Sequence, residues 1–391
     1  MNNINHKQKR ILFVSHESSR TGAPLVLLNL VRWIKSNTDL SFGILLKEDG
    51  ELADDFRILG PTWIFSKKAK KRDILGRILS KFYTSALYNS IKNFILLKRI
   101  RPKSYDLVYS NTFANGEILH FLNHTNVLSH VHELSNTIYQ LGNANLSWVK
   151  EYTLKYIAVS EVVKQELIDN FSINSNQIVV QNPFFVPVKI PTISEDDLRK
   201  ALNINQDYRV IGGAGNTDWR KGSDLFVQLA GVLSRNYKSE KLFFIWVGQT
   251  GSGLEQNFKN LQYDLKKLGI EATFHFTGMI PNPQDYFRLF DVFVLTSRED
   301  PYPLVVLENA SLKKPIVCFD GSGGIPEFIE EDAGFIIPYL DLTKATERII
   351  DILESNNLRD RLGNAAFKKL YERHEFNHSC NKLFEVIKTM I

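Results

Sequence analysis

Three carboxylates lie close together in the segment 291–327. Glu299 and Asp300 follow an apolar run that is typical of a buried strand, and Glu308 comes eight residues after Asp300. The prolines next to Asp300 suit the first turn of a helix, where the amide that proline lacks would have no partner. Glu308 then lies one to two turns into that helix, between apolar neighbours. A carboxylate on the buried side of a helix needs hydrogen-bond donors, and the two hydroxyls of a ribose could supply them.

The first turn of this expected helix presents backbone amides to an approaching anion. These amides belong to Tyr302, Leu304 and Val305. A purely structural interpretation is also open, in which the two acids that precede the helix cap it and Glu308 pairs with a nearby lysine.

Cations and histidines occur at other strand ends. Lys221, next to Arg220, precedes a helical stretch, where the structural interpretation is an exposed lysine at a helix start. His130 and His132 end a strand candidate, where a histidine is more often structural than catalytic. Gly22 follows the first strand, where it would be unremarkable as part of an ordinary turn.

Taken in chain order, these segments resemble the retaining glycosyltransferases of family 4, which have the GT-B fold. Asp300 and Glu308 align with the E-x7-E motif of that family, with Asp in place of the usual first Glu. The resemblance implies that Asp300 or its neighbour Glu299 contacts the donor sugar and that Glu308 holds the ribose. It places Lys221 at the diphosphate, with Arg220 as a substitute for a family arginine that is Asn216 here.

The resemblance extends over roughly residues 10 to 375. It implies that His132, with His130 as the alternative, faces the donor sugar and that Gly22 completes the phosphate wall. Backbone groups of Gly278, Met279 and Ile280 would cradle the base.

The activity implied is retaining transfer of a hexose from a nucleotide-diphosphate sugar, by family frequency a UDP-sugar, to a glycan or lipid-linked acceptor in polysaccharide biosynthesis. No cofactor and no obligatory metal are implied, and the sequence has no Asp-x-Asp element. Two alternatives remain open: a GT-B-fold sugar-nucleotide epimerase, and a non-catalytic nucleotide-binding scaffold.

Short apolar runs alternate with amphipathic stretches, which predicts parallel sheets with crossover helices. The expected strands are 11–15, 42–46, 107–110, 127–130 and 157–160, then 209–213, 242–248, 273–278, 291–296, 315–319 and 334–337. We therefore expect an α/β protein of the GT-B class, with two Rossmann-like doubly wound domains that face each other across a cleft. Residues 1–185 would form the acceptor-side domain and 186–375 the nucleotide-sugar domain. A helix over about 376–391 would pack back on the first domain.

Composition narrows the function classes. The 391 residues suggest two or three domains, and 43% hydrophobic with 23% charged residues excludes wholesale disorder. Two cysteines cannot form a disulfide framework. The first apolar run is too short for a signal peptide or a membrane span, so we expect a cytoplasmic protein.

The net charge of +5 is concentrated in one segment. Between residues 61 and 104 there are twelve Lys or Arg and one acid, whereas the rest of the chain is net acidic, so a nucleic-acid partner is not expected. The apolar spacing predicts two short helices there, broken near Asn89–Ser90, because a four-residue step drifts around a helix. One interpretation is that these helices pack on the N-terminal sheet with their charges in solvent. The other is that residues 67–103 bind an anionic membrane surface, at the inner face of the membrane, or a lipid-linked acceptor.

Overall fold

The computed structural model describes residues 8–65, 85–187, 191–239, 241–251 and 253–391, and for residues 85–92 only the backbone. The chain divides into two compact units. Unit 1 comprises Met1–Asn182 and Asn377–Ile391, and unit 2 comprises Pro183–Phe376.

Unit 1 contains a seven-stranded parallel sheet of order β3-β2-β1-β4-β5-β6-β7. Its strands are β1 Arg10–Ser15, β2 Ser41–Leu46, β3 Thr62–Ile64, β4 Leu107–Asn111, β5 Val127–Val131, β6 Lys155–Ala158 and β7 Ile178–Val180. Its helices are α1 Gly22–Asn37, α2 Ala53–Leu59, α4 Ser85–Ile100, α5 Gly116–Leu122, α6 Ser135–Gln140, α7 Asn143–Tyr152, α8 Glu161–Asp169 and most of α17 Phe376–Lys388. The central strand β1 is fully buried from Ile11 to Val14, as expected for a parallel strand that is covered on both faces.

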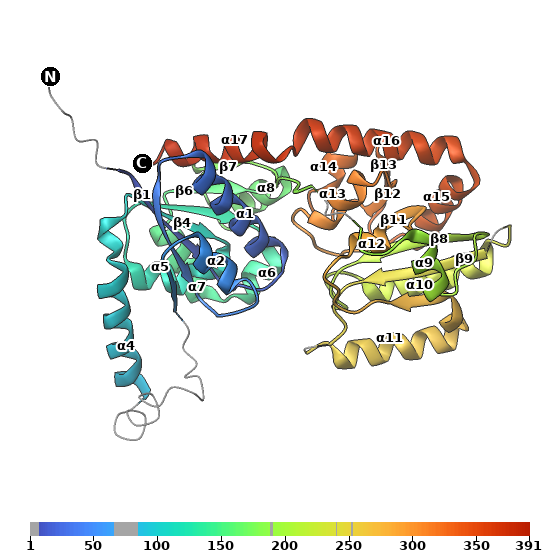
Figure 1. Ribbon diagram of the computed structural model, residues 1–391, viewed down its shortest axis with the longest axis horizontal. Helices are drawn as coiled ribbons and strands as arrows, with labels where there is room; N and C mark the ends of the chain where they lie inside the picture. The colour runs from blue at the N-terminus through green and yellow to red at the C-terminus, as the bar shows by residue number, and fades with distance from the viewer. Residues whose placement is uncertain (1–7, 66–84, 188–190, 240, 252) are drawn as a thin grey trace. The chain divides into compact units, whose positions relative to one another are not determined.

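Unit 2 contains a six-stranded parallel sheet of order β10-β9-β8-β11-β12-β13, with helices on both faces (Figure 1). Its strands are β8 Tyr208–Ala214, β9 Lys241–Val247, β10 Phe274–Phe276, β11 Val292–Leu295, β12 Ile316–Phe319 and β13 Gly334–Ile337. Its helices are α9 Glu195–Ala201, α10 Ser223–Asn236, α11 Glu255–Leu268, α12 Gln284–Phe287, α13 Leu304–Ser311, α14 Ile325–Ile329, α15 Leu342–Glu354 and α16 Asn356–Arg373.

The last residues of the chain pack on unit 1. Nε1 of Trp33 donates to Oδ1 of Asn377 at 3.2 Å, and Nδ2 of Asn126 donates to the backbone oxygen of Met390 at 2.6 Å. The C-terminal segment thus closes unit 1 after the chain has built unit 2. Within the described residues, the structure has no helix with the length and apolarity needed to cross a membrane.

The predicted doubly wound architecture is confirmed, and each predicted strand differs from the observed one by at most two residues at either end. Two strands were missed, β3 and β7, both of which are short and lie at the edges of the sheet. The expected helix break near Asn89–Ser90 is wrong, because α4 runs without interruption from Ser85 to Ile100.

The strand order reverses direction between β1 and β4 in unit 1 and between β8 and β11 in unit 2. In open α/β sheets, ligands bind outside the carboxyl ends of the strands at such switch points. The loops that follow these four strands are therefore the places where functional side chains are expected.

Candidate functional site

The loops after β8 and β11 bring two cations and a carboxylate together in unit 2. Nζ of Lys221 lies 2.5 Å from Oδ2 of Asp300, and Nη1 of Arg220 lies 3.8 Å from Oδ1 of the same carboxylate. Oγ of Ser297 also donates to Oδ2 of Asp300 at 3.1 Å. Asp300 is buried, and these three groups surround it at the switch point.

Gly222 allows the two loops to approach this closely. Its φ of 68° lies in the left-handed region, and a Cβ at this position would be 2.0 Å from the backbone oxygen of Thr296. The hydroxyl of Thr296 donates to the backbone oxygen of Gly222 at 2.8 Å, and the amide of Arg298 donates to that of Arg220 at 2.8 Å. The position of Lys221 therefore depends on a contact that only glycine permits.

A second glycine holds Asp300 from the other side. The amide of Asp300 donates to the backbone oxygen of Ser322 at 2.7 Å. Gly323 has φ 139°, and a Cβ there would be 1.7 Å from the backbone oxygen of Asp300. The Gly323–Gly324 turn thus fixes the backbone of the acid that the cations contact.

Burial and the Asp300 carboxylate have opposite effects on the pKa of Lys221. Burial lowers the pKa of Lys221, and the Asp300 carboxylate beside it acts in the opposite direction. An anion that reached Lys221 and Arg220 would compete with Asp300 for both cations. The cluster can therefore bind a phosphate group only by sharing or displacing the contacts of Asp300.

Asp300 and its neighbour Glu299 have different surroundings. The backbone oxygen of Glu299 accepts from Nη1 of Arg220 at 3.1 Å, whereas the side chain of Asp300 contacts both cations. Of the two acids that the sequence proposes for the donor sugar, the geometry joins Asp300 to Lys221.

Glu308 lies in α13, half-buried, and burial raises the pKa of its carboxyl to about 7. Within the part of the chain that the structure describes, its carboxylate has no hydrogen-bond or ion-pair partner, so the lysine required by the structural interpretation is not found. The carboxyl is therefore available to a ligand that donates hydrogen bonds.

The helix itself begins at Leu304, with Pro303 as the residue before it. Leu304 and Val305 are its first two residues, and their amides have no acceptor within the helix. The hydroxyl of Tyr302 contacts Nε2 of His374 at 3.0 Å, and burial raises its pKa. The Tyr302 side chain thus has a structural contact. The role predicted from the sequence, binding of an anion, concerns the backbone amide of Tyr302.

The predicted base-binding backbone follows β10. Gly278, with φ 67°, forms an isolated antiparallel bridge with Gly248, which follows β9. Met279 is exposed and Ile280 is half-buried. These residues lie at the same carboxyl edge of the sheet as Lys221, and their role remains a prediction.

In unit 1, His132 lies at the carboxyl edge of β5. Its Nε2 is 3.1 Å from Oδ1 of Asn111, whose Nδ2 donates to the backbone oxygen of Ala23 at 2.8 Å. Burial, together with the nearby His130 and His16, holds the pKa of His132 well below its ordinary value. His132 is therefore neutral at working pH, with its proton on Nε2 and Nδ1 left as an acceptor.

The alternative histidine, His130, is fully buried. Its Nδ1 is 2.7 Å from the hydroxyl of Tyr109, and burial lowers its pKa to about 3. The centres of the His130 and His132 rings lie 4.1 Å apart, so the buried His130 packs against the half-buried His132.

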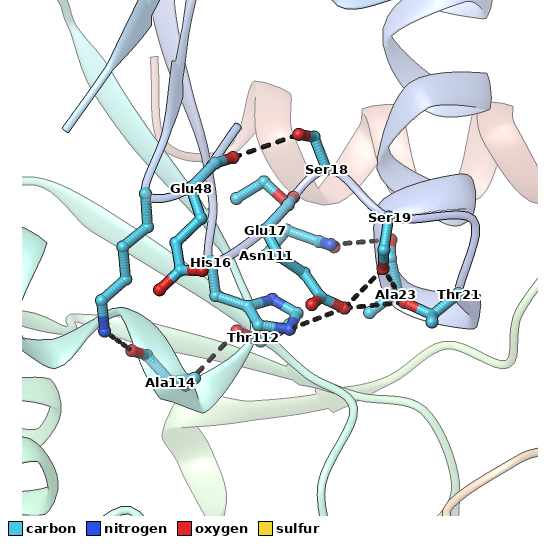
Figure 2. Close-up of polar contacts among 12 residues, drawn as sticks. His16, Glu17, Ser18, Ser19, Thr21, Ala23, Glu48, Asn111, Thr112 and Ala114 are labelled. Atoms are coloured by element: carbon cyan, nitrogen blue, oxygen red, sulfur yellow. Dashed lines mark hydrogen bonds and ion pairs between the residues drawn. The ribbon is translucent and has the colours of Figure 1, made fainter. Parts of the chain in front are cut away.

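The loop between β1 and α1 carries a carboxylate that the sequence analysis did not single out (Figure 2). Oε1 of Glu17 accepts from the hydroxyls of Ser19 and Thr21, both at 2.8 Å, and lies 3.4 Å from Nε2 of His16. These contacts lower the pKa of Glu17 to about 2. An anion approaching the exposed Gly22 would meet this negative charge, so the predicted phosphate wall at Gly22 includes an acid.

Glu17, His16 and Asn111 share one signal that could have found them. Each is a polar residue at the end of a switch-point strand, β1 or β4, or within two residues after it. The strand order that makes these positions special is not visible in the sequence.

Comparison with known proteins shows which family and which fold this chain resembles. Residues 194–369 match the family model described as Glycosyl transferases group 1. The O-antigen biosynthesis glycosyltransferase WclY of Escherichia coli is 30% identical over 34% of this chain, and the match spans 33% of that protein. The D-inositol 3-phosphate glycosyltransferase of Corynebacterium urealyticum is 22% identical over 73% of this chain and 72% of its own length.

Among solved structures, Anabaena HepE in complex with UDP and glucose superimposes with a TM-score of 0.79. It is 18% identical, over 97% of this chain and 100% of that one. At this identity the likeness shows the fold. Residues 194–369 are therefore similar to the group 1 glycosyl transferases, and the chain has the GT-B fold.

Proposed function

We propose that this protein is a retaining glycosyltransferase that moves a hexose from a UDP-sugar to a glycan or lipid-linked acceptor in polysaccharide biosynthesis. The observation that carries the proposal is the meeting of Arg220, Lys221 and Asp300 at the switch point between β8 and β11, inside the region that matches the family model.

The residues of unit 2 supply the groups that such a reaction needs. In front-face transfer, the bond from the anomeric carbon to the diphosphate oxygen breaks while the acceptor oxygen bonds to the same face, and the hydroxyl proton passes to the departing phosphate. Lys221, with Arg220, stabilises the charge on that phosphate, and Asp300 or Glu299 contacts the sugar. Glu308 accepts from the ribose hydroxyls, and the backbone of Gly278 to Ile280 holds the base.

The relatives support the choice of donor and pathway. WclY is named for O-antigen biosynthesis, and HepE was solved with UDP and glucose. No obligatory metal and no cofactor take part in the reaction as proposed. His132 orients the donor sugar from unit 1, and Gly22 completes the phosphate wall.

The proposal includes a cytoplasmic location, peripheral at the inner face of the membrane, through residues 67–103. Residues 67–84 lie outside the described residues, and for this segment the structure describes side chains only from Asn93 onward. The support that remains is the charge of residues 93–103, which contain four Lys or Arg and no acid.

A panel of nucleoside diphosphates tests the donor first. Stabilisation follows RT ln(1 + [L]/Kd), so the nucleotide that raises the Tm most at equal concentration identifies the base. Incubation with the matching nucleotide sugars and candidate acceptors then tests transfer, and NMR of the product shows whether the anomeric configuration is retained.

The same samples distinguish the alternatives. An isomer of the nucleotide sugar formed without acceptor would identify an epimerase. Binding without turnover of any donor would identify a scaffold. An inverted product would contradict the retaining assignment while leaving glycosyl transfer intact.

A further inference from the structure

The end of α4 exposes apolar side chains next to cations. Helix α4 projects from the sheet of unit 1 (Figure 1). Phe94 is 58% exposed and Ile95 is 47% exposed, and the next turn carries the exposed Lys98 and Arg99. Nζ of Lys98 lies 4.5 Å from the centre of the Phe94 ring. An aromatic ring, an aliphatic side chain and two cations thus share one exposed stretch of helix.

A groove adjoins this stretch. It has a volume of about 760 Å³, within the range of roughly 300–1,000 Å³ found for small-molecule sites. Its walls come from the end of α4, the short turn after it and the end of α5, and they include Leu97, Arg101, Lys103 and Phe121. The groove therefore combines apolar walls with two cations.

The two cations of the groove, Arg101 and Lys103, are exposed. Across the described residues, no carboxylate forms an ion pair with either of them. The turn that carries them packs on unit 1, since Pro102 between them is buried and Oγ of Ser104 accepts from Nη1 of Arg10 at 2.9 Å. Among the described residues, no protein anion neutralises either cation.

This combination fits one occupant better than the others. A solvated surface helix has no need of exposed Phe94 and Ile95, and a soluble phosphate would use the cations but not the apolar walls. A bilayer with anionic lipid uses both, because aromatic and aliphatic side chains enter the interface while Lys and Arg attract the negative surface.

We propose that this groove seats an anionic phospholipid of a bilayer, with its phosphate on Arg101 and Lys103 and its hydrocarbon along Leu97 and Phe121. Phe94 and Ile95 enter the interface beside it. The inference deepens the peripheral location proposed above, rests on it, and adds a specific lipid site.

Sedimentation of the full-length protein with vesicles tests the site. The vesicles contain phosphatidylcholine alone or phosphatidylcholine with phosphatidylglycerol, each at low and high salt. We expect the parent protein to sediment with the anionic vesicles only, and R101E/K103E to lose at least about tenfold in partitioning. The matched control K266E/K267E changes the same charge on the exposed face of α11 in unit 2 and is expected to bind as the parent does.

A second variant separates the apolar contribution. F94S/I95S keeps every cation, so we expect it to bind anionic vesicles at low salt and to lose more binding than the parent as salt rises, since exposed charges are then screened. Unchanged salt dependence of F94S/I95S would remove the interfacial role of α4. Circular dichroism of each variant confirms that the fold is kept.

Three results would overturn the lipid site. The first is sedimentation of R101E/K103E with anionic vesicles to the same extent as the parent protein. The second is a parent protein that does not bind anionic vesicles. The third is a change in oligomeric state of R101E/K103E, seen by analytical ultracentrifugation, without a change in vesicle binding, which would make the groove an interface between copies.

The activity assay keeps the two proposals apart. UDP release with a soluble acceptor does not require the groove, so R101E/K103E is expected to turn over as the parent does. Vesicle binding by a protein that turns over no donor would leave the lipid site standing and refute the proposed transferase. Turnover of a donor by a protein that does not bind vesicles would support the transferase and refute the lipid site.

Discussion

The ammonium nitrogen of Lys221 lies 2.5 Å from Oδ2 of Asp300, although 79 residues separate them in the chain. The two residues were expected to act on different parts of the donor, Lys221 on the diphosphate and Asp300 on the sugar. Their contact means that a diphosphate must share the ammonium with Asp300 or displace it. Binding of the donor and release of Asp300 toward the sugar are therefore coupled in the proposed mechanism.

Replacing Lys221 with alanine is expected to lower kcat by more than about 100-fold, the scale for removing one electrostatic stabiliser of a transition state. Steady-state UDP release measures the effect. Lys200→Ala, an exposed lysine of α9, is the matched control and should leave kcat unchanged. A near-normal kcat in folded K221A would assign the role to Arg220 or another cation.

The same substitution leaves Asp300 buried without its closest cation. Breaking a buried pair costs ~3–5 kcal/mol, so the Tm of K221A should fall. The double variant K221A/D300N removes the stranded charge and should recover most of the Tm but none of the turnover. Recovery of both would show that K221A acts only through folding.

Asp300→Asn is expected to reduce kcat more than Glu299→Gln does. Asp300 contacts Lys221, Arg220 and Ser297 through its side chain, whereas Arg220 meets the backbone of Glu299. Both changes remove one charge and keep the shape of the side chain. A larger loss in E299Q would move the donor contact to Glu299.

Glu308 should make nucleotide binding pH-dependent. Its pKa is about 7 in the free protein against an ordinary 4.5, and ribose hydroxyls that donate to the carboxylate favour the ionised form. Binding of UDP near pH 6 to 7 is therefore expected to release a proton. Calorimetry in two buffers of different ionisation enthalpy measures the release. E308Q should reduce the release and weaken UDP binding, whereas the exposed control E347Q should do neither.

The raised pKa of Glu308 also affects folding. The folded-state pKa of Glu308 lies above its unfolded-state pKa. Its contribution to the free energy of unfolding is therefore fully present below pH 4.5 and is lost as the pH rises through about 7. In denaturant titrations across this range, E308Q should show less loss of stability than the parent. An identical pH dependence in both proteins would contradict the assignment.

His132 is expected to stay neutral, so its NMR signals should not titrate between about pH 5 and 8. Asn111→Asp places a carboxylate at Nε2 and should raise the pKa of His132 into that range, because a nearby negative charge favours the imidazolium. Asn176→Asp, on an exposed turn, is the control. Titration of His132 in the parent would show that burial does not control its charge.

Glu17 should contribute to acid sensitivity. Its pKa is about 2 in the folded state against 4.5 ordinarily, so its stabilisation is present above pH 4.5 and is lost as the pH falls toward 2. Urea midpoints at several acidic pH values should fall less steeply in E17Q than in the parent. Equal slopes would mean that the hydroxyls of Ser19 and Thr21 do not favour the ionised form.

The sequence alone determined the architecture, because the strands of a parallel sheet are buried on both faces and appear as continuous apolar runs. Residues 291–296 were predicted as a strand for this reason, and the observed strand β11, Val292–Leu295, is buried throughout. The edge strand β3 was missed, since its three residues are only half-buried and carry no such run. Helix α4 was predicted to break because its apolar row drifts around the axis, yet a helix that projects from its unit need not keep that row on one face.

The sequence also indicated Lys221, Asp300 and Glu308 one by one, as polar residues at strand ends or inside an apolar helix. It did not indicate that Lys221 and Asp300 touch, nor that His16, Glu17 and Asn111 accompany His132 in unit 1. Those relationships depend on strand order, which places β8 beside β11 and β1 beside β4. Strand order is set by the packing of the whole sheet and by no local pattern, so only the tertiary structure decided which of these side chains meet.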